Sequence, residues 1–144
     1  MLSHFVGVNI AVNNLAEAVA KYQALLGIEP TMIGAEGFAF PGLKGAAFNF
    51  NGVMINLIAS TEDSSSVARF LQSRGEGVFL VSIGSNDIEA DVAALSRKGI
   101  QCLLPQVKSG EFGKVNFIHP KQLCGVQLEI FEASDKHRKT VGLG

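Results

Sequence analysis

The stretch VNIAVNNL, from Val8 to Leu15, returns as VSIGSNDI from Val81 to Ile88. Both copies alternate apolar residues with small or polar ones, the pattern of a strand that buries one face. A helical pattern follows each copy and ends in a glycine, at Gly27 in the first and at Gly99 in the second. Because strand, helix and glycine stop recur in the same order, the sequence predicts one structural unit used twice.

The rest of the chain extends the repeat. FNF at 48–50 corresponds to VNF at 115–117, and INLIAS at 55–60 corresponds to LEIFEA at 128–133, so the unit is a βαβββ module. Asn14 and Glu17 have the spacing of a helix cap, and Asn51-Gly52 is typical of a hairpin turn. The predicted strands are 5–12, 30–33, 46–50 and 54–58 in module one and 78–84, 101–104, 113–119 and 125–131 in module two, with helices at 15–26 and about 87–98.

The predicted fold class is α+β. Each module is incomplete alone, so we expect the two to join into one cupped mixed sheet with the helices outside. We expect a single domain over 1–144, with module one at about 5–60, a linker helix at about 64–75, module two at about 77–133 and a C-terminal tail at 134–144.

Composition excludes several classes of partner. The chain of 144 residues is 47% hydrophobic with a net charge of −1, which is typical of a globular protein with a sizeable core. It lacks the basic field that nucleic-acid binding needs, and its one cationic run, KHRK at 136–139, is expected to be a solvated tail. No apolar run approaches the roughly 20 residues of a membrane span, so we expect a cytoplasmic protein with no membrane partner.

The two cysteines, Cys102 and Cys124, have neither the spacing of a disulfide framework nor that of a metal site. We expect both to be reduced. Cys124 follows His119 by five residues, but no acid nearby in sequence could orient a Cys/His nucleophile pair.

Three segments carry a resemblance to a known family. They read IAVNNL at 10–15, SVARFLQSRGEG at 66–77, and FIHPK at 117–121 followed by GVQLE at 125–129. With the paired βαβββ modules, they resemble the vicinal oxygen chelate superfamily of glyoxalases, bleomycin-resistance proteins and extradiol dioxygenases, and within it the methylmalonyl-CoA epimerases. The resemblance covers nearly the whole chain.

The resemblance implies a metal site whose four ligand positions fall on Gly7, Asn56, Leu80 and Glu129. Only Glu129 keeps a family ligand. One carboxylate and one amide are too few donors for a transition metal, which normally has three or more protein ligands, so we expect no metal and no cofactor. His4 could restore a ligand, but it lies three residues before Gly7 and should point to the other face unless a β-bulge intervenes.

The family also places a catalytic glutamate in the loop before the third strand. The matching segment, FPGLK at 40–44, has no acid, and the nearest one, Glu36, is out of register. His119 belongs to the His-Pro-Lys turn, where we favour a loop side chain over a catalytic one.

What remains for chemistry is Glu129. In an apolar cup its pKa should be raised, which suits a general acid or base. The alternative is a relic carboxylate that is hydrogen-bonded to Asn56. Polar strand residues are unusual, and parity places Asn9, Asn56 and Ser82 in the cup. The predicted substrate-binding residues are Asn9, Asn56, Leu80, Ser82, Gln127 and Phe131.

Two functions stay open. The first is a metal-independent isomerase, epimerase or lyase that acts on a small carbonyl or acyl-CoA compound, with Glu129 as the catalytic residue. The second is a non-catalytic small-molecule binding protein of the bleomycin-resistance type, so whether the protein is an enzyme is left open. Exposed edge strands and the habit of the superfamily lead us to expect a homodimer in either case.

Overall fold

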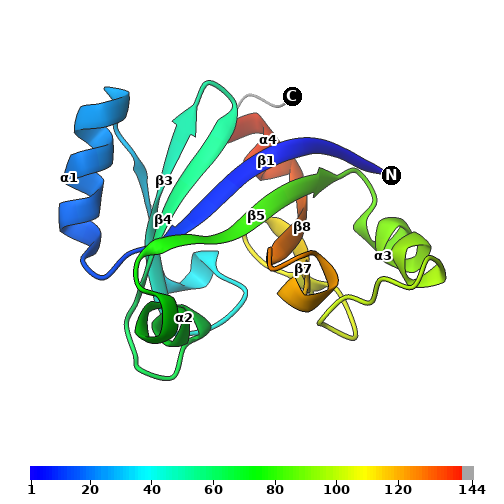
Figure 1. Cartoon of the computed structure of the whole chain (residues 1–144). Coiled ribbons are helices and arrows are strands. Elements are labelled where there is room, and N and C mark those ends of the chain that lie inside the picture. Colours follow the sequence, from blue (N-terminus) through cyan, green and yellow to red (C-terminus); the bar gives the residue numbers. More distant parts are fainter. Residues whose placement is uncertain (141–144) are drawn as a thin grey trace. The chain divides into compact units, whose positions relative to one another are not determined.

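The computed structural model describes residues 1–140, with only the backbone for 138–140 (Figure 1). It divides into two compact units, and each is described by itself. The N-terminal unit is Gly7–Phe79. The C-terminal unit is the chain from Leu80 onward together with Met1–Val6.

The N-terminal unit has the strand order β2-β3-β4-β1, in which β1 runs parallel to β4 and the other pairs are antiparallel. Only the second half of β1, from Gly7, belongs to this unit. Its elements are β1 (Leu2–Ala11), α1 (Leu15–Leu26), β2 (Thr31–Ile33), the 3-10 turn η1 (Ala35–Gly37), β3 (Leu43–Phe50), β4 (Val53–Ser60) and α2 (Ser66–Arg74).

Local sequence sets the ends of α1 as predicted. The Asn14 side chain accepts a hydrogen bond from the backbone N–H of Glu17, and Gly27 ends the helix in the left-handed conformation. The helix packs on one face of β3 and β4, where Phe48 and Leu57 are fully buried. Asn51 and Gly52 both have positive φ, which the predicted hairpin turn between β3 and β4 requires.

The opposite face of this sheet is covered in part by α2. Ser65 caps that helix by accepting from the backbone N–H of Ala68, and Val67 packs with Ala11 and Ile58. Asn9 and Asn56 share this face, because they lie two residues before Ala11 and Ile58 in the paired strands.

The C-terminal unit has the order β5-β8-β7-β6, with β5 parallel to β8 and the other pairs antiparallel. Helix α3 packs against β8, and their core holds Ile88, Ile118 and Ile130. The elements are β5 (Gly77–Ser85), α3 (Ile88–Arg97), β6 (Lys108–Ser109), β7 (Gly113–Ile118), the 3-10 turn η2 (Pro120–Gln122), β8 (Leu128–Ala133) and α4 (Asp135–Thr140).

The predicted strand at 101–104 is wrong. Cys102 makes one isolated bridge to Ile118. The second strand of module two is β6, which lies further along the chain. The reason is a side chain: Asn116 is fully buried and bonds both the N–H and the C=O of Leu104, so these groups need no strand partner.

Other boundaries differ from the prediction as well: β1 begins at Leu2 rather than at 5, and β3 begins at Leu43 rather than at 46. Strand β8 begins at Leu128 rather than at 125, because Cys124 and Gly125 both have positive φ and turn the chain. The tail predicted at 134–144 forms helix α4 up to Thr140, and residues 141–144 lie outside the described part. None of the helices in the described range combines the length and the apolar character that crossing a membrane requires.

Element order in the two halves is β1-α1-β2-β3-β4 and β5-α3-β6-β7-β8. The predicted α+β class with tandem βαβββ modules is therefore confirmed.

Candidate functional site

Ser82 and Glu129 form a polar pair in the C-terminal unit. They face each other in the parallel register of β5 and β8, and the Ser82 hydroxyl donates to Oε1 of Glu129 over 2.8 Å. Because Leu128 and Ile130 point toward α3, alternation places Glu129 on the other face of the sheet. Ser82 and Glu129 therefore share the face of this sheet that is turned away from α3.

The surroundings of Glu129 change its proton affinity. Phe117 lies opposite it on β7 and is buried, and so is Ser82 on the other side. Burial raises the pKa of Glu129 from 4.5 to about 7, and the hydrogen bond from Ser82 only partly opposes the rise. A carboxyl group with this pKa can both accept and donate a proton near neutral pH.

Asn9 and Asn56 form the corresponding pair of the N-terminal unit. They face each other in the parallel register of β1 and β4, and Nδ2 of Asn56 donates to Oδ1 of Asn9 over 2.9 Å. The other oxygen, Oδ1 of Asn56, is buried and has no hydrogen-bond partner within the described part of the chain. A buried acceptor of this kind needs a donor, which a bound ligand or a water molecule can supply.

The open alternative from sequence, a Glu129 bonded to Asn56, is not the arrangement found. Glu129 bonds Ser82, and Asn56 bonds Asn9, so each pair forms within its own module.

The residues at the family's metal positions do not fit a divalent metal. Gly7 has φ 155°, and a Cβ atom there would lie 1.8 Å from the carbonyl oxygen of Met54, so no ligating side chain can occupy the position. Leu80 is 3% exposed and apolar. Asn56 and Glu129 are then the only oxygen donors of the four, below the three protein ligands usual for such a site.

His4 lies on the same face of β5 as Ser82. A Cβ atom on Gly84 would lie 2.2 Å from Cε1 of His4, so the imidazole ring occupies the space of a side chain at 84. Gly84 is two residues from Ser82 and thus has the same orientation. The sequence argument placed His4 on the face opposite to that of Gly7 unless a β-bulge intervened, and Gly7 itself has a φ of 155°.

Gln127 and Phe131, two further predicted binding residues, also belong to the C-terminal unit. The backbone carbonyl of Gln127 accepts from the N–H of Val81, which extends the β5–β8 pairing. Phe131 faces Gly84 in the register, and its ring centroid lies 5.7 Å from that of His137. Burial lowers the pKa of His137. Sequence reasoning missed His137 because it was assigned to a solvated tail.

Several other candidates have structural roles. Oδ1 of Asn49 accepts from Gly52 in the hairpin turn, and Asn116 holds Leu104 in place. His119 is exposed and caps η2 by accepting from the N–H of Lys121, which agrees with a loop role. Glu36 lies in the 3-10 turn η1. Burial raises the pKa of the Cys102 thiol, which makes that thiol less reactive.

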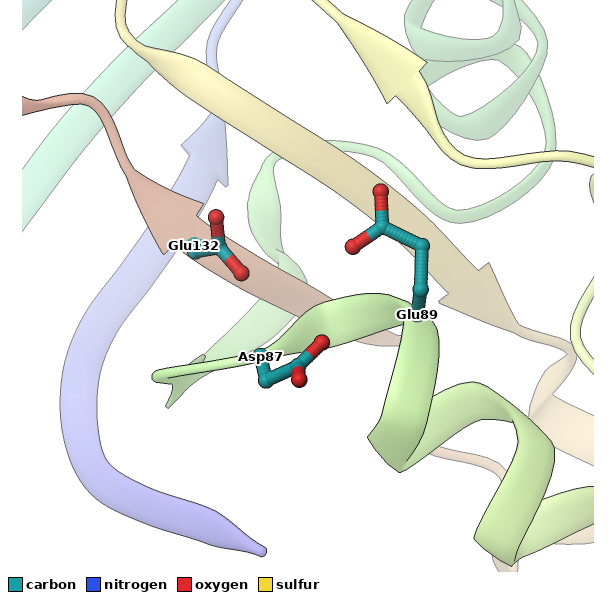
Figure 2. Close-up of side chains that lie close together, drawn as sticks. All are labelled: Asp87, Glu89 and Glu132. Atoms are coloured by element: carbon teal, nitrogen blue, oxygen red, sulfur yellow. The ribbon is translucent and has the colours of Figure 1, made fainter.

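One cluster of carboxylates has the spacing of a cation site. Asp87 and Glu89 at the start of α3 and Glu132 on β8 bring oxygens within 4.8 Å of one another (Figure 2). All three already have partners: Asp87 accepts from Ala90 N–H, Glu132 from Ile88 N–H, and Glu89 pairs with Lys114 at 3.0 Å. The cluster is best explained as the cap of α3.

Comparison with known proteins places the chain in a family. Residues 7–118 match the Glyoxalase/Bleomycin resistance protein/Dioxygenase superfamily. Human mitochondrial methylmalonyl-CoA epimerase is 33% identical over 130 residues, which are 88% of this chain and 72% of the human protein.

Two solved structures resemble the whole chain. The crystal structure of methylmalonyl-CoA epimerase from Mycobacterium tuberculosis has a TM-score of 0.83 at 29% identity, and the match covers 94% of this chain and 91% of that one. A variant of the Streptomyces coelicolor epimerase in complex with 2-nitronate-propionyl-CoA has a TM-score of 0.82 at 27% identity, with 93% and 99% covered. The chain belongs to the Glyoxalase/Bleomycin resistance protein/Dioxygenase superfamily, and within that superfamily it is similar to the methylmalonyl-CoA epimerases.

Proposed function

We propose that this protein is a metal-independent epimerase or related isomerase that moves the α-proton of an acyl-CoA thioester or a similar small carbonyl compound. The observation that carries the proposal is the Ser82–Glu129 pair, whose carboxyl group has its pKa raised to about 7 by burial. An α-proton beside a thioester carbonyl is acidic enough for such a group to remove when the site is shielded from water.

The substrate class is supported by the relatives. The Streptomyces coelicolor structure holds 2-nitronate-propionyl-CoA, an acyl-CoA ester with a negatively charged group where an enolate would form. We propose that this chain binds a thioester of the same class. A lyase that begins with the same proton removal would use the same residues.

We assign Glu129 the proton transfer and Ser82 its orientation, with Leu80, Gln127 and Phe131 as further ligand contacts. Asn9 and Asn56 are proposed as ligand contacts of their own module. The support is the buried Oδ1 of Asn56, which lacks a donor within the described residues and would gain one from a ligand N–H or O–H.

The proposal involves no metal, because too few side chains at the family's metal positions can act as ligands. Gly7 and Leu80 stand where imidazole ligands are expected, and the geometry at Gly7 has no room for any side chain. The lack of metal ligands also favours a second function, a binding protein of the bleomycin-resistance type, which needs a shaped site but no electrophile.

The two functions differ in one measurement. The protein is incubated with methylmalonyl-CoA in heavy water, and loss of the α-proton signal is followed by NMR. An epimerase exchanges the proton. Glu129→Gln lowers the exchange rate of the enantiomer whose α-proton faces Glu129 by about 10²-fold or more, while the exposed Glu111→Gln retains it. If the wild-type protein binds the thioester but exchanges no proton, the enzyme proposal fails and the binding protein stands.

We also propose a cytoplasmic homodimer. Cys102 and Cys124 are both free thiols, which suits a reducing compartment. Strand β2, at the outside of its sheet, leaves the Met32 side chain 60% exposed, and a second copy could cover it. Analytical ultracentrifugation tests the dimer directly: a monomer at micromolar concentration contradicts it.

A further inference from the structure

His4 and Glu129 lie on one face of the C-terminal unit, although they are far apart in sequence. The ring of His4 fills the side-chain space above Gly84, with Cε1 at 2.2 Å and Nε2 at 2.4 Å from the position of a Cβ atom. Glu129 accepts a hydrogen bond from Ser82, which lies on β5 two residues before Gly84. Two residues along a strand span about 7 Å, so His4 and Glu129 lie against positions of β5 that are separated by about this length.

Ser3 determines which ring nitrogen of neutral His4 carries the hydrogen. Its hydroxyl donates to the carbonyl oxygen of Gly84 at 3.2 Å and also contacts Nδ1 of His4 at 2.8 Å. A hydroxyl group has one hydrogen, and the carbonyl can only accept. Both bonds therefore coexist only when Nδ1–H of His4 donates to Ser3, which leaves the lone pair of Nε2 free to take a proton.

We propose that His4 is the second proton-transfer residue of this site and acts on the face of the substrate opposite to Glu129. The inference rests on the proposed function, because inversion at an α-carbon needs one group on each face. Ser3 is a positioning residue, since it acts only through the ring of His4.

The spacing suits such a pair. Reacting atoms approach to about 3–3.5 Å, so a carbon held between two proton-transfer groups needs them about 6–7 Å apart. The positions of β5 that His4 and Glu129 contact, Gly84 and Ser82, are separated by a length of this order, about 7 Å.

The proton balance closes without a co-reactant. The Glu129 carboxylate removes the α-proton, and the electron pair of the broken C–H bond moves to the thioester oxygen to give an enolate. The protonated His4 then donates from Nε2 to the other face, where the new C–H bond forms. The product leaves Glu129 protonated and His4 neutral, and the opposite enantiomer reacts through the same steps in reverse.

The test compares exchange with inversion for each enantiomer of methylmalonyl-CoA in heavy water. Wild-type protein should exchange and invert both. His4→Gln should lose inversion by about 10²-fold or more, and should still exchange the enantiomer whose α-proton faces Glu129, with retention of configuration. Glu129→Gln should show the mirror result and exchange only the other enantiomer.

The outcomes separate the two proposals. A wild-type protein that exchanges neither enantiomer overturns the proposed function and His4 with it. An active wild type with a His4→Gln variant that inverts at the wild-type rate overturns His4 alone. Activity that a chelator abolishes and added Co²⁺ restores also overturns the assignment, because His4 would then be a metal ligand.

Two further variants guard against a fold defect. His119→Gln changes an exposed histidine of the same unit and should behave as wild type. Ser3→Ala keeps the imidazole but removes its hydrogen-bond partner, and should lower the ratio of inversion to exchange. Free imidazole should restore part of the inversion in His4→Ala. Failure of this rescue together with an unchanged ratio in Ser3→Ala contradicts a proton-transfer role.

Discussion

At the scale of the residue, one carboxyl group explains most of the proposed chemistry. Glu129 stands between Ser82 and Phe117 in the register of three strands, and its pKa is raised to about 7 because burial disfavours its charge. Sequence parity predicts only the face on which Glu129 lies. It could not show that Ser82 is the hydrogen-bond partner, because the register of β5 with β8 depends on the packing of both strands.

The same shift predicts how stability changes with pH. The folded pKa of Glu129, about 7, lies above its ordinary value of 4.5, so folding takes up a proton between these pH values. The free energy of unfolding contributed by this group is greatest below pH 4.5 and falls as pH rises to about 7, by on the order of 3 kcal/mol.

Glu129→Gln should remove this dependence. Urea unfolding of both proteins at pH 5 and pH 8 measures it, and every other titrating group cancels in the comparison. The free energy of unfolding of the variant minus that of the wild type should be more positive at pH 8 than at pH 5, because only the wild type loses stability as pH rises. An equal difference at both values contradicts a raised pKa.

A second prediction concerns Gly7. Gly7→Ala places a methyl group 1.8 Å from the Met54 carbonyl oxygen at φ 155°, so β1 and β4 must separate locally. We expect the free energy of unfolding to fall by about 3 kcal/mol. Gly77→Ala is the matched control, since nothing lies within 4 Å of its Cβ position. Equal stability of the two variants would show that the register at Gly7 is wrong.

At the scale of the element, local signals decided what sequence could predict. Helix α1 ends where predicted because Asn14 and Gly27 act within one turn of the chain. The strand predicted at 101–104 failed because its backbone partner is the side chain of Asn116, a contact that no local pattern announces. The contact of the His4 ring with Gly84 is likewise hidden from local patterns, because the two residues are far apart in sequence.

Asn116 gives the prediction at this scale. Asn116→Leu keeps the branched shape and the number of side-chain heavy atoms but leaves the N–H and the C=O of Leu104 without their partner in the connection before β6. We expect a loss of about 3 kcal/mol in the free energy of unfolding. The exposed Asn13→Ala should change it by less than about 0.5 kcal/mol. Thermal denaturation compares the two, and an unaffected Asn116→Leu contradicts the role given to this side chain.

At the scale of the whole molecule, the chain has the fold of its superfamily, and the proposed chemistry depends on single positions within that fold. Residues 7–118 match the family in sequence, and the TM-score of 0.83 to a solved epimerase concerns the backbone. The repeat could be predicted from sequence because each module restates its strands, helix and glycine stop. We propose that the chemistry differs at single positions. Gly7 and Leu80 stand at two positions that the resemblance assigns to metal ligands, and Asn9–Asn56 and Ser82–Glu129 are hydrogen-bonded pairs.

The central claim is proton transfer without a metal, and its most direct test is α-proton exchange in heavy water by protein treated with a chelator and checked for metal content. We predict that metal-free protein exchanges the α-proton of methylmalonyl-CoA at the rate of the untreated protein, and that added cobalt or zinc does not raise the rate. Exchange that disappears on chelation and returns with a stoichiometric metal would contradict the account.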